Sequence, residues 1–136
     1  MSMTDYQLML LAVAARKNSY SPYSGFRVGA ALLGKSGKLY PGCNVENASY
    51  SATNCAERTA IFRAVSEGEK EFEAIAIVGG PGEALLDFCA PCGVCRQVLS
   101  EFCGPDFRVV LGTPNNYKSY KLEELLPYSF GKKDLE

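Results

Sequence analysis

The sequence predicts an α/β domain in which helices cover both faces of a sheet. Two observations lead to this fold class. Short apolar runs of strand length alternate along the chain with segments whose apolar residues recur at helical spacing. The 136 residues also contain no internal repeat, low-complexity tract or linker, so residues 1–136 are expected to form one domain.

The first third of the chain predicts a helix followed by a hairpin. Thr4 is a candidate N-cap, and the residues after it are apolar at helical spacing: Leu8, Leu11, Ala12 and Ala15. The turn-forming residues 21–25 should end this helix. The apolar segments 26–33 and 39–45 then predict two strands, joined by a turn at Ser36 and Gly37.

The remainder of the chain predicts further helices and strands in alternation. Helices are expected at 55–67 and 92–103, with these residues inward: Ala60, Ile61, Ala64, Val65, Val94, Val98, Leu99 and Phe102. Strands are expected at 72–78 and 107–111, and a short one at 117–122. A loop should run from Gly79 to Pro91, and a last helix should begin within 122–126.

The composition excludes several classes of function. The chain has no histidine, which rules out Ser-His-Asp triads, zinc sites of two histidines and a carboxylate, and histidine general bases. The net charge is −1 and the basic residues are scattered, which argues against nucleic acid or a membrane surface as a partner. No apolar run is long enough for a membrane span, and the N-terminus does not look like a signal peptide. We therefore expect a cytoplasmic protein with reduced cysteines.

Two short motifs carry the chemistry: Cys55-Ala56-Glu57 and Pro91-Cys92-Gly93-Val94-Cys95. Cys92 and Cys95 are three residues apart at the start of a predicted helix, so both sulfurs should lie on one face. Cys55 also falls at a predicted helix start, where the helix dipole lowers the pKa of a thiol. Thiolates in a reducing compartment favour zinc.

Three interpretations of these cysteines remain open on the residues alone. The Cys-x-x-Cys pair is compatible with a redox motif. A closed structural zinc site would add a fourth ligand from Cys43, Cys89 or Cys103. A catalytic zinc site would use three cysteines and keep an open position for water, beside which Glu57 is placed to move protons.

The chain resembles the short, homotetrameric cytidine deaminases of the cytidine and deoxycytidylate deaminase superfamily. The resemblance rests on Cys-Ala-Glu, Pro-Cys-x-x-Cys, the segment 42–47 (Gly-Cys-Asn-Val-Glu-Asn) and Cys95-Arg96-Gln97, and it covers nearly the whole chain. It implies a three-layer α/β/α sandwich with a central mixed sheet of about five strands. It also implies zinc-dependent hydrolysis of cytidine, and of deoxycytidine, to uridine or deoxyuridine and ammonia in pyrimidine salvage.

The resemblance assigns roles to individual residues. It implies that Cys55, Cys92 and Cys95 hold zinc, and that a zinc-bound hydroxide attacks C4 of the base with Glu57 as proton shuttle. It places six residues at the substrate, the last two closing the pocket of a neighbouring subunit: Phe26, Asn44, Glu46, Ala56, Tyr50 and Phe130.

Within the substrate-binding set, Asn44 and Glu46 would bind the ribose 3′-hydroxyl and Phe26 would pack against the pyrimidine ring. Asn44 and Glu46 are two residues apart on a predicted strand, so they share a face. A two-residue hairpin turn would put Phe26 and Asn44 on opposite faces, and an odd-length turn or a bulge would reverse that.

A charge argument adds Arg58. Three thiolates around Zn²⁺ carry a local charge of −1, which weakens the metal as a Lewis acid. Arg58 follows Glu57 directly and is expected to compensate this charge through N–H···S contacts in the shell around the ligands. Arg96, next to Cys95, is a second candidate for this role.

Two other functions compete with the leading one. A deaminase of a cytosine-nucleoside antibiotic shares the Cys-Ala-Glu and Pro-Cys-Gly-x-Cys-Arg motifs, although Glu46 favours an ordinary nucleoside. A structural zinc module would leave Glu57 without a role. Deaminases of polynucleotides or of deoxycytidylate usually have histidine as the first ligand and need basic contacts to phosphate, and this chain shows neither.

Overall fold

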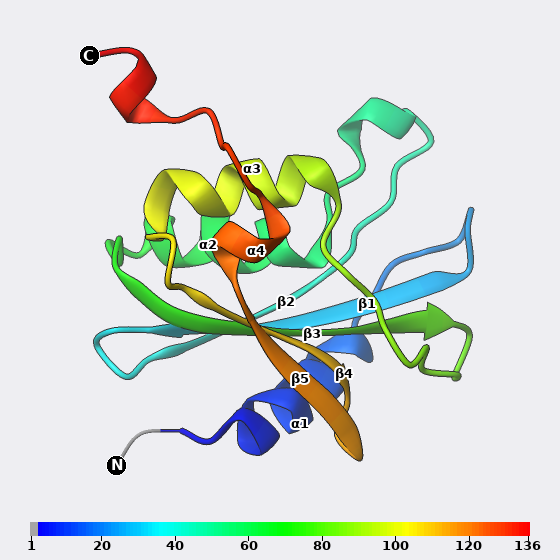
Figure 1. The fold of residues 1–136 in the computed structure, drawn as a ribbon. Helices are drawn as coiled ribbons and strands as arrows, with labels where there is room; N and C mark the ends of the chain where they lie inside the picture. Colours follow the sequence, from blue (N-terminus) through cyan, green and yellow to red (C-terminus); the bar gives the residue numbers. More distant parts are fainter. Residues whose placement is uncertain (1–2) are drawn as a thin grey trace.

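The computed structural model describes residues 3–136, which form four α-helices and five strands (Figure 1). In chain order the helices and strands are α1 (Asp5–Arg16), β1 (Phe26–Gly34), β2 (Leu39–Cys43), α2 (Ala56–Ser66), β3 (Phe72–Pro81), α3 (Gly93–Phe102), β4 (Arg108–Thr113), β5 (Asn116–Lys121) and α4 (Leu122–Leu125). Short 3-10 helices lie at Tyr50–Ala52 and Lys132–Asp134.

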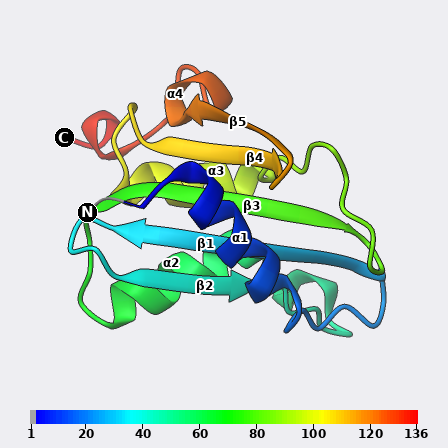
Figure 2. The ribbon, with the colours of Figure 1, turned by 90° about the horizontal axis from the view of Figure 1, so that it is seen from below.

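The strands form one mixed sheet in the order β2-β1-β3-β4-β5. Only β3 and β4 are parallel, and every other neighbouring pair is antiparallel. Helix α1 lies on one face of the sheet, and α2 and α3 lie on the other (Figures 1 and 2). Each face has its own apolar core, so the predicted three-layer sandwich is confirmed. None of the helices within 3–136 is long and apolar enough to cross a membrane.

Helix α1 begins at the predicted cap. The Thr4 hydroxyl accepts from the Gln7 amide at 3.1 Å, and the Gln7 side chain accepts from the Thr4 amide at 3.0 Å, which completes a capping box. Leu8, Met9 and Ala12 face the sheet and are fully buried. Leu11 was expected inward and is 37% exposed, because it lies on the flank of the helix next to this stripe.

Arg16 closes the C-terminal end of α1 against the sheet and is only 7% exposed. Its Nε donates to the Arg27 carbonyl at 2.8 Å. Its Nη2 donates to three carbonyls at the end of β3 and in the loop after it, those of Gly80, Gly82 and Ala84, at 2.6–3.0 Å. Sequence reasoning did not single out Arg16. The guanidinium ties three distant segments together through main-chain oxygens.

We expect Arg16→Met to lower the free energy of unfolding by about 3 kcal/mol, because it leaves several half-buried carbonyls without a charged donor. Urea unfolding followed by circular dichroism measures the change. Lys17→Met is the matched control, since Lys17 is the exposed neighbour of Arg16 and its loss should cost less than about 0.5 kcal/mol. An equal loss in both variants would contradict the role given to Arg16.

The length of the turn between β1 and β2 decides whether positions 26 and 44 lie on the same face of the sheet. Leu33 pairs with Leu39, and the Gly34 amide donates to the Lys38 carbonyl at 2.9 Å, which leaves a three-residue turn. Gly37 in this turn has φ of +93°, a conformation that favours glycine. Paired residue numbers therefore have the same parity, and positions 26 and 44 fall on one face, the face that α2 and α3 cover.

Helix α2 packs directly onto strand β2 through small residues. A Cβ atom at Gly42 would lie 2.4 Å from the Ala56 carbonyl oxygen and 2.6 Å from the Ala60 nitrogen, so only glycine fits there. Ala56, Ala60 and Ala64 on the helix are fully buried against the sheet. This close approach fixes the N-terminal end of α2, where Cys55 lies.

Two predicted features differ from the structure. Strand β3 continues to Pro81 because Gly79 and Gly80 pair with Val28 and Arg27 of β1, although their glycine content predicted a loop. Val94 was expected inward and is 59% exposed. The inward face of α3 is instead built on Cys95 and Leu99, four residues apart.

Candidate metal centre

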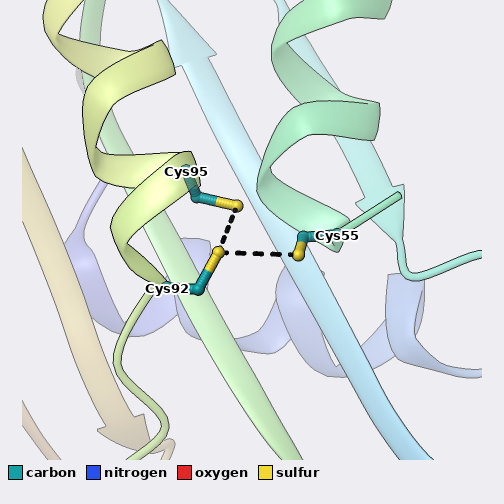
Figure 3. Close-up of side chains that lie close together, drawn as sticks. All are labelled: Cys55, Cys92 and Cys95. Atoms are coloured by element: carbon teal, nitrogen blue, oxygen red, sulfur yellow. Dashed lines mark hydrogen bonds between the residues drawn. The ribbon is translucent and has the colours of Figure 1, made fainter. Parts of the chain in front are cut away.

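Three cysteine sulfurs meet where the N-terminal ends of α2 and α3 converge (Figure 3). Cys55 is the N-cap of α2 and Cys92 the N-cap of α3, with Cys95 one turn further along. Cys92 Sγ lies 3.8 Å from Cys55 Sγ and 3.4 Å from Cys95 Sγ. All three sulfurs lie within 4.8 Å of one another, a spacing that fits ligands of a single ion.

The donor set fits a zinc ion with an open position. Thiolate sulfur is a preferred zinc ligand, and three protein ligands leave the fourth tetrahedral position free. Among residues 3–136 no fourth cysteine joins this group, and Cys43, Cys89 and Cys103 are separate free thiols. The closed four-cysteine alternative therefore lacks its fourth sulfur in the described part of the chain.

Burial raises the pKa of the three cysteines outside the cluster: that of Cys43 is raised, that of Cys89 is raised to about 11 and that of Cys103 to about 12. Within the cluster, the hydrogen bond with Cys55 and burial raise the pKa of Cys95 as well. The two sets of cysteines are therefore distinguished by the positions of their sulfurs.

One cluster sulfur is strongly predisposed to ionise. Hydrogen bonds from Cys95 first, and then from Arg58, lower the pKa of Cys55 to about 5 despite its partial burial. Arg58 Nη2 donates to Cys55 Sγ at 3.1 Å from one helical turn away. Burial alone would lower the pKa of Arg58, but its bonds to the Cys55 and Cys95 sulfurs raise it. Arg58 thus makes an N–H···S contact, and its role in compensating the charge of a metal site remains a prediction.

Arg96 does not contact the cysteine sulfurs in this way. Its Nε donates to the Pro91 carbonyl at 2.8 Å and its Nη1 to the Leu125 carbonyl at 2.6 Å. It thus ties the residue before Cys92 to the end of α4. The expectation that Arg96 is a second compensating cation is replaced by a role in holding the ligand-bearing loop.

Glu57 lies in the first turn of α2, next to the sulfur cluster, and is only 4% exposed. Burial raises the pKa of its carboxyl to about 7, and the charge of Cys55 acts in the same direction. A carboxyl with this pKa can accept or release a proton near neutral pH, a task for which the chain has no histidine. The cluster thus combines a metal-binding set with a proton-transfer group.

The comparisons with known proteins fit this arrangement. The model of the family described as "Cytidine and deoxycytidylate deaminase zinc-binding region" matches residues 2–113. The chain belongs to this deaminase family. Among its relatives, the cytidine deaminase of Halalkalibacterium halodurans is 46% identical, with 96% of this chain and 98% of the relative covered. The cytidine deaminase of Sporosarcina psychrophila is 48% identical, with 89% of this chain and 87% of the relative covered.

Solved structures of deaminases give the same picture. The crystal structure of cytidine deaminase from Burkholderia pseudomallei superposes with a TM-score of 0.87 at 47% identity, covering 94% of this chain and 100% of that one. The crystal structure of the cytidine deaminase from Mycobacterium tuberculosis superposes with a TM-score of 0.79 at 38% identity, covering 96% of this chain and 99% of that one. The fold of this deaminase therefore agrees with that of its relatives.

The residues expected at the substrate come from several segments. Phe26, Asn44 and Glu46 come from the end of the hairpin nearest residues 23 and 24, and Ala56 is the first residue of α2. The amide of Ala56 belongs to the first helical turn, which has no intrahelical acceptor for it. Tyr50 is 78% exposed and borders a surface cavity together with Glu46, whereas Phe130 is 59% exposed and borders a different cavity. The substrate roles of all six residues remain predictions.

Proposed function

We propose that this chain is a zinc-dependent cytidine deaminase, which hydrolyses cytidine, and deoxycytidine, to the uridine product and ammonia. The observation that carries the proposal is a buried carboxyl with a pKa near 7 beside three clustered cysteine sulfurs. A structural zinc module has no need of such a group. Cytidine is the substrate named for its relatives, and the proposal extends that substrate to this chain.

Cys55, Cys92 and Cys95 would hold the metal. When bound there, zinc supplies a Lewis acid that lowers the pKa of a water molecule to about 7. The Glu57 carboxylate takes a proton from the attacking water and delivers it to N3 of the cytosine ring. After water has added at C4, the same carboxylate takes the second proton from the new C4 hydroxyl and passes it to the exocyclic amino group, which leaves as ammonia as the C4 carbonyl forms. Glu57 is thus base first and acid later.

Asn44 and Glu46 would hold the ribose and Phe26 would pack against the ring, while Ala56 would contact the base through its main chain. This places the sugar and the metal ligands on the same side of the sheet, in agreement with the shared face of positions 26 and 44. A sugar anchored by these residues would hold C4 of the base in place for attack.

The working enzyme would be a cytoplasmic homotetramer that serves pyrimidine salvage. Tyr50 and Phe130 are exposed aromatic side chains, and each would close the active site of a neighbouring subunit. Burial of such side chains at a subunit interface would be favourable. The chain carries a net charge of −1, which favours a nucleoside over a nucleic acid as its partner.

The direct test is the fall in ultraviolet absorbance near the cytidine band when purified protein is mixed with cytidine, with and without a zinc chelator. Conversion to uridine that the chelator abolishes is the expected result. A folded, zinc-loaded protein that leaves cytidine unchanged would refute the proposal. Testing a cytosine-nucleoside antibiotic alongside would then separate a different substrate from a structural zinc site.

Arg58→Ala should lower zinc affinity or turnover by about 10- to 100-fold, as is typical when a group that supports metal ligands is removed. The reason is the loss of its 3.1 Å bond to Cys55 Sγ and of its positive charge. Arg63→Ala is the matched control, because Arg63 is on the same helix and makes an exposed pair with Glu67. Zinc content by mass spectrometry and steady-state kinetics measure both, and identical behaviour of the two variants would exclude the role.

A further inference from the structure

Two serines contact the proposed sugar-binding pair, and each donates a hydrogen bond to one member of it. Ser19 Oγ donates to Asn44 Oδ1, and Ser24 Oγ donates to Glu46 Oε2. Ser24 and Glu46 also border a surface cavity of about 410 Å³, lined in addition by Tyr23, Asn47, Tyr50 and Thr53. The hydrogen bonds already made by the pair show which ones it has left to offer.

The Asn44 amide is almost fully used. Its Oδ1 accepts from the Val28 amide at 3.0 Å as well as from Ser19, and its Nδ2 donates to the Phe26 carbonyl at 2.8 Å. These main-chain partners fix the orientation of the side-chain amide, because the Val28 N–H can only donate and the Phe26 carbonyl can only accept. Among the bonds formed within residues 3–136, Asn44 keeps one unused group, the second hydrogen of Nδ2.

The Glu46 carboxylate is used in a complementary way. Its Oε1 accepts from the amides of Tyr23 at 3.0 Å and of Ser24 at 3.1 Å, and its Oε2 accepts from the Ser24 hydroxyl. The Phe26 amide donates to Ser24 Oγ at 2.9 Å, so the hydroxyl hydrogen is directed to the carboxylate. The bond from Ser24 lowers the pKa of Glu46, which keeps it ionised. Within the described residues, an acceptor position remains on Oε2.

The pair therefore presents one donor and one acceptor, which is the complement of a hydroxyl group. We infer that Ser19 and Ser24 are positioning residues that make the pair specific for a substrate hydroxyl, one that donates to Glu46 and accepts from Asn44. The inference rests on the proposed function and assigns its sugar selectivity to two residues that act through the pair. A fluorine or a phosphate at that position has no hydrogen to give Glu46, and a phosphate would meet its negative charge.

The test compares cytidine with 3′-deoxycytidine, which lacks the hydroxyl, in the wild type and in Ser24→Ala. The wild type should prefer cytidine in kcat/KM by about 10- to 100-fold, the usual range for a hydrogen bond to a charged group. In Ser24→Ala the preference should shrink to a few-fold, because Glu46 loses the bond that aims Oε2. Ser24→Thr keeps the hydroxyl and should restore the preference.

The chain offers a matched control at the other end of β1. Ser36 binds Glu69 with the same pattern: its amide and hydroxyl donate to the carboxylate, and the Lys38 amide donates to its Oγ at 3.2 Å. Ser36→Ala removes the same bonds far from the proposed site. It should leave the preference between the two substrates at the wild-type value.

The outcomes separate the inference from the function it rests on. Ser24→Ala that keeps the wild-type preference while its absolute rates fall would overturn the inference alone, since that is how mere destabilisation behaves. The same holds if Ser36→Ala lowers the preference as much as Ser24→Ala does. A zinc-loaded wild type that turns over neither substrate would instead overturn the proposed function, and the inference with it. Thermal unfolding of each variant verifies that it is folded.

Discussion

Glu57→Gln should abolish turnover of cytidine, by at least about 10³-fold, while the protein keeps its zinc. General acid–base groups contribute about 10²- to 10⁴-fold, and Glu57 serves both the attack and the departure of ammonia in the proposed reaction. Glutamine has the same shape but cannot take up a proton. Because Glu57 is not one of the three clustered ligands, its replacement should leave the metal in place.

The measurement is kcat/KM together with zinc content per chain. Glu67→Gln is the control, because Glu67 is the C-cap of the same helix, at its exposed end, where it pairs with Arg63 at the surface. It should match the wild type in both quantities. If Glu57→Gln remained active, or if it lost zinc together with activity, Glu57 would have to be a structural or metal-binding group instead.

Most of the fold could be predicted because its signals are local. The Thr4 cap, the turn residues before β1 and the apolar stripes of α2 and α3 each mark an element within a few residues of sequence. The misplaced features depend on contacts from elsewhere in the chain. Gly79 and Gly80 extend β3 because β1 pairs with them, and the small size of glycine also leaves room for the returning loop, where Cys89 and Ala84 approach.

The site was predictable to a different extent. Cysteine spacing and helix starts placed the three sulfurs, because an N-cap position defines where a side chain points. Whether Phe26 and Asn44 share a face depended on the number of residues in the hairpin turn. The spacing of residues in the sequence does not fix that number. The hydrogen bonds of Arg16 and Ser24 escaped prediction because their partners are main-chain groups and a carboxylate far away in sequence.

Cys95→Ala should remove both the metal and the activity. Cys95 is the fully buried member of the cluster, so no water-exposed side chain can take its place. Loss of a direct ligand should lower zinc affinity by more than the about 10- to 100-fold that a supporting residue costs. Without the metal, two helix ends that meet at Cys55 and Cys92 lose their common partner. The variant should therefore also unfold at a lower temperature than the wild-type holoenzyme.

Cys89→Ala is the control that makes this test specific. Cys89 precedes Cys92 at the same spacing at which Cys95 follows it, so sequence alone leaves it as a competing ligand. In the structure it lies outside the sulfur cluster, packed beside Gly79, and its pKa is raised to about 11 by burial. Cys89→Ala should therefore hold one zinc per chain and stay active. If Cys89→Ala lost zinc while Cys95→Ala retained it, Cys89 would be the third metal ligand in place of Cys95, and the proposed ligand set would be wrong.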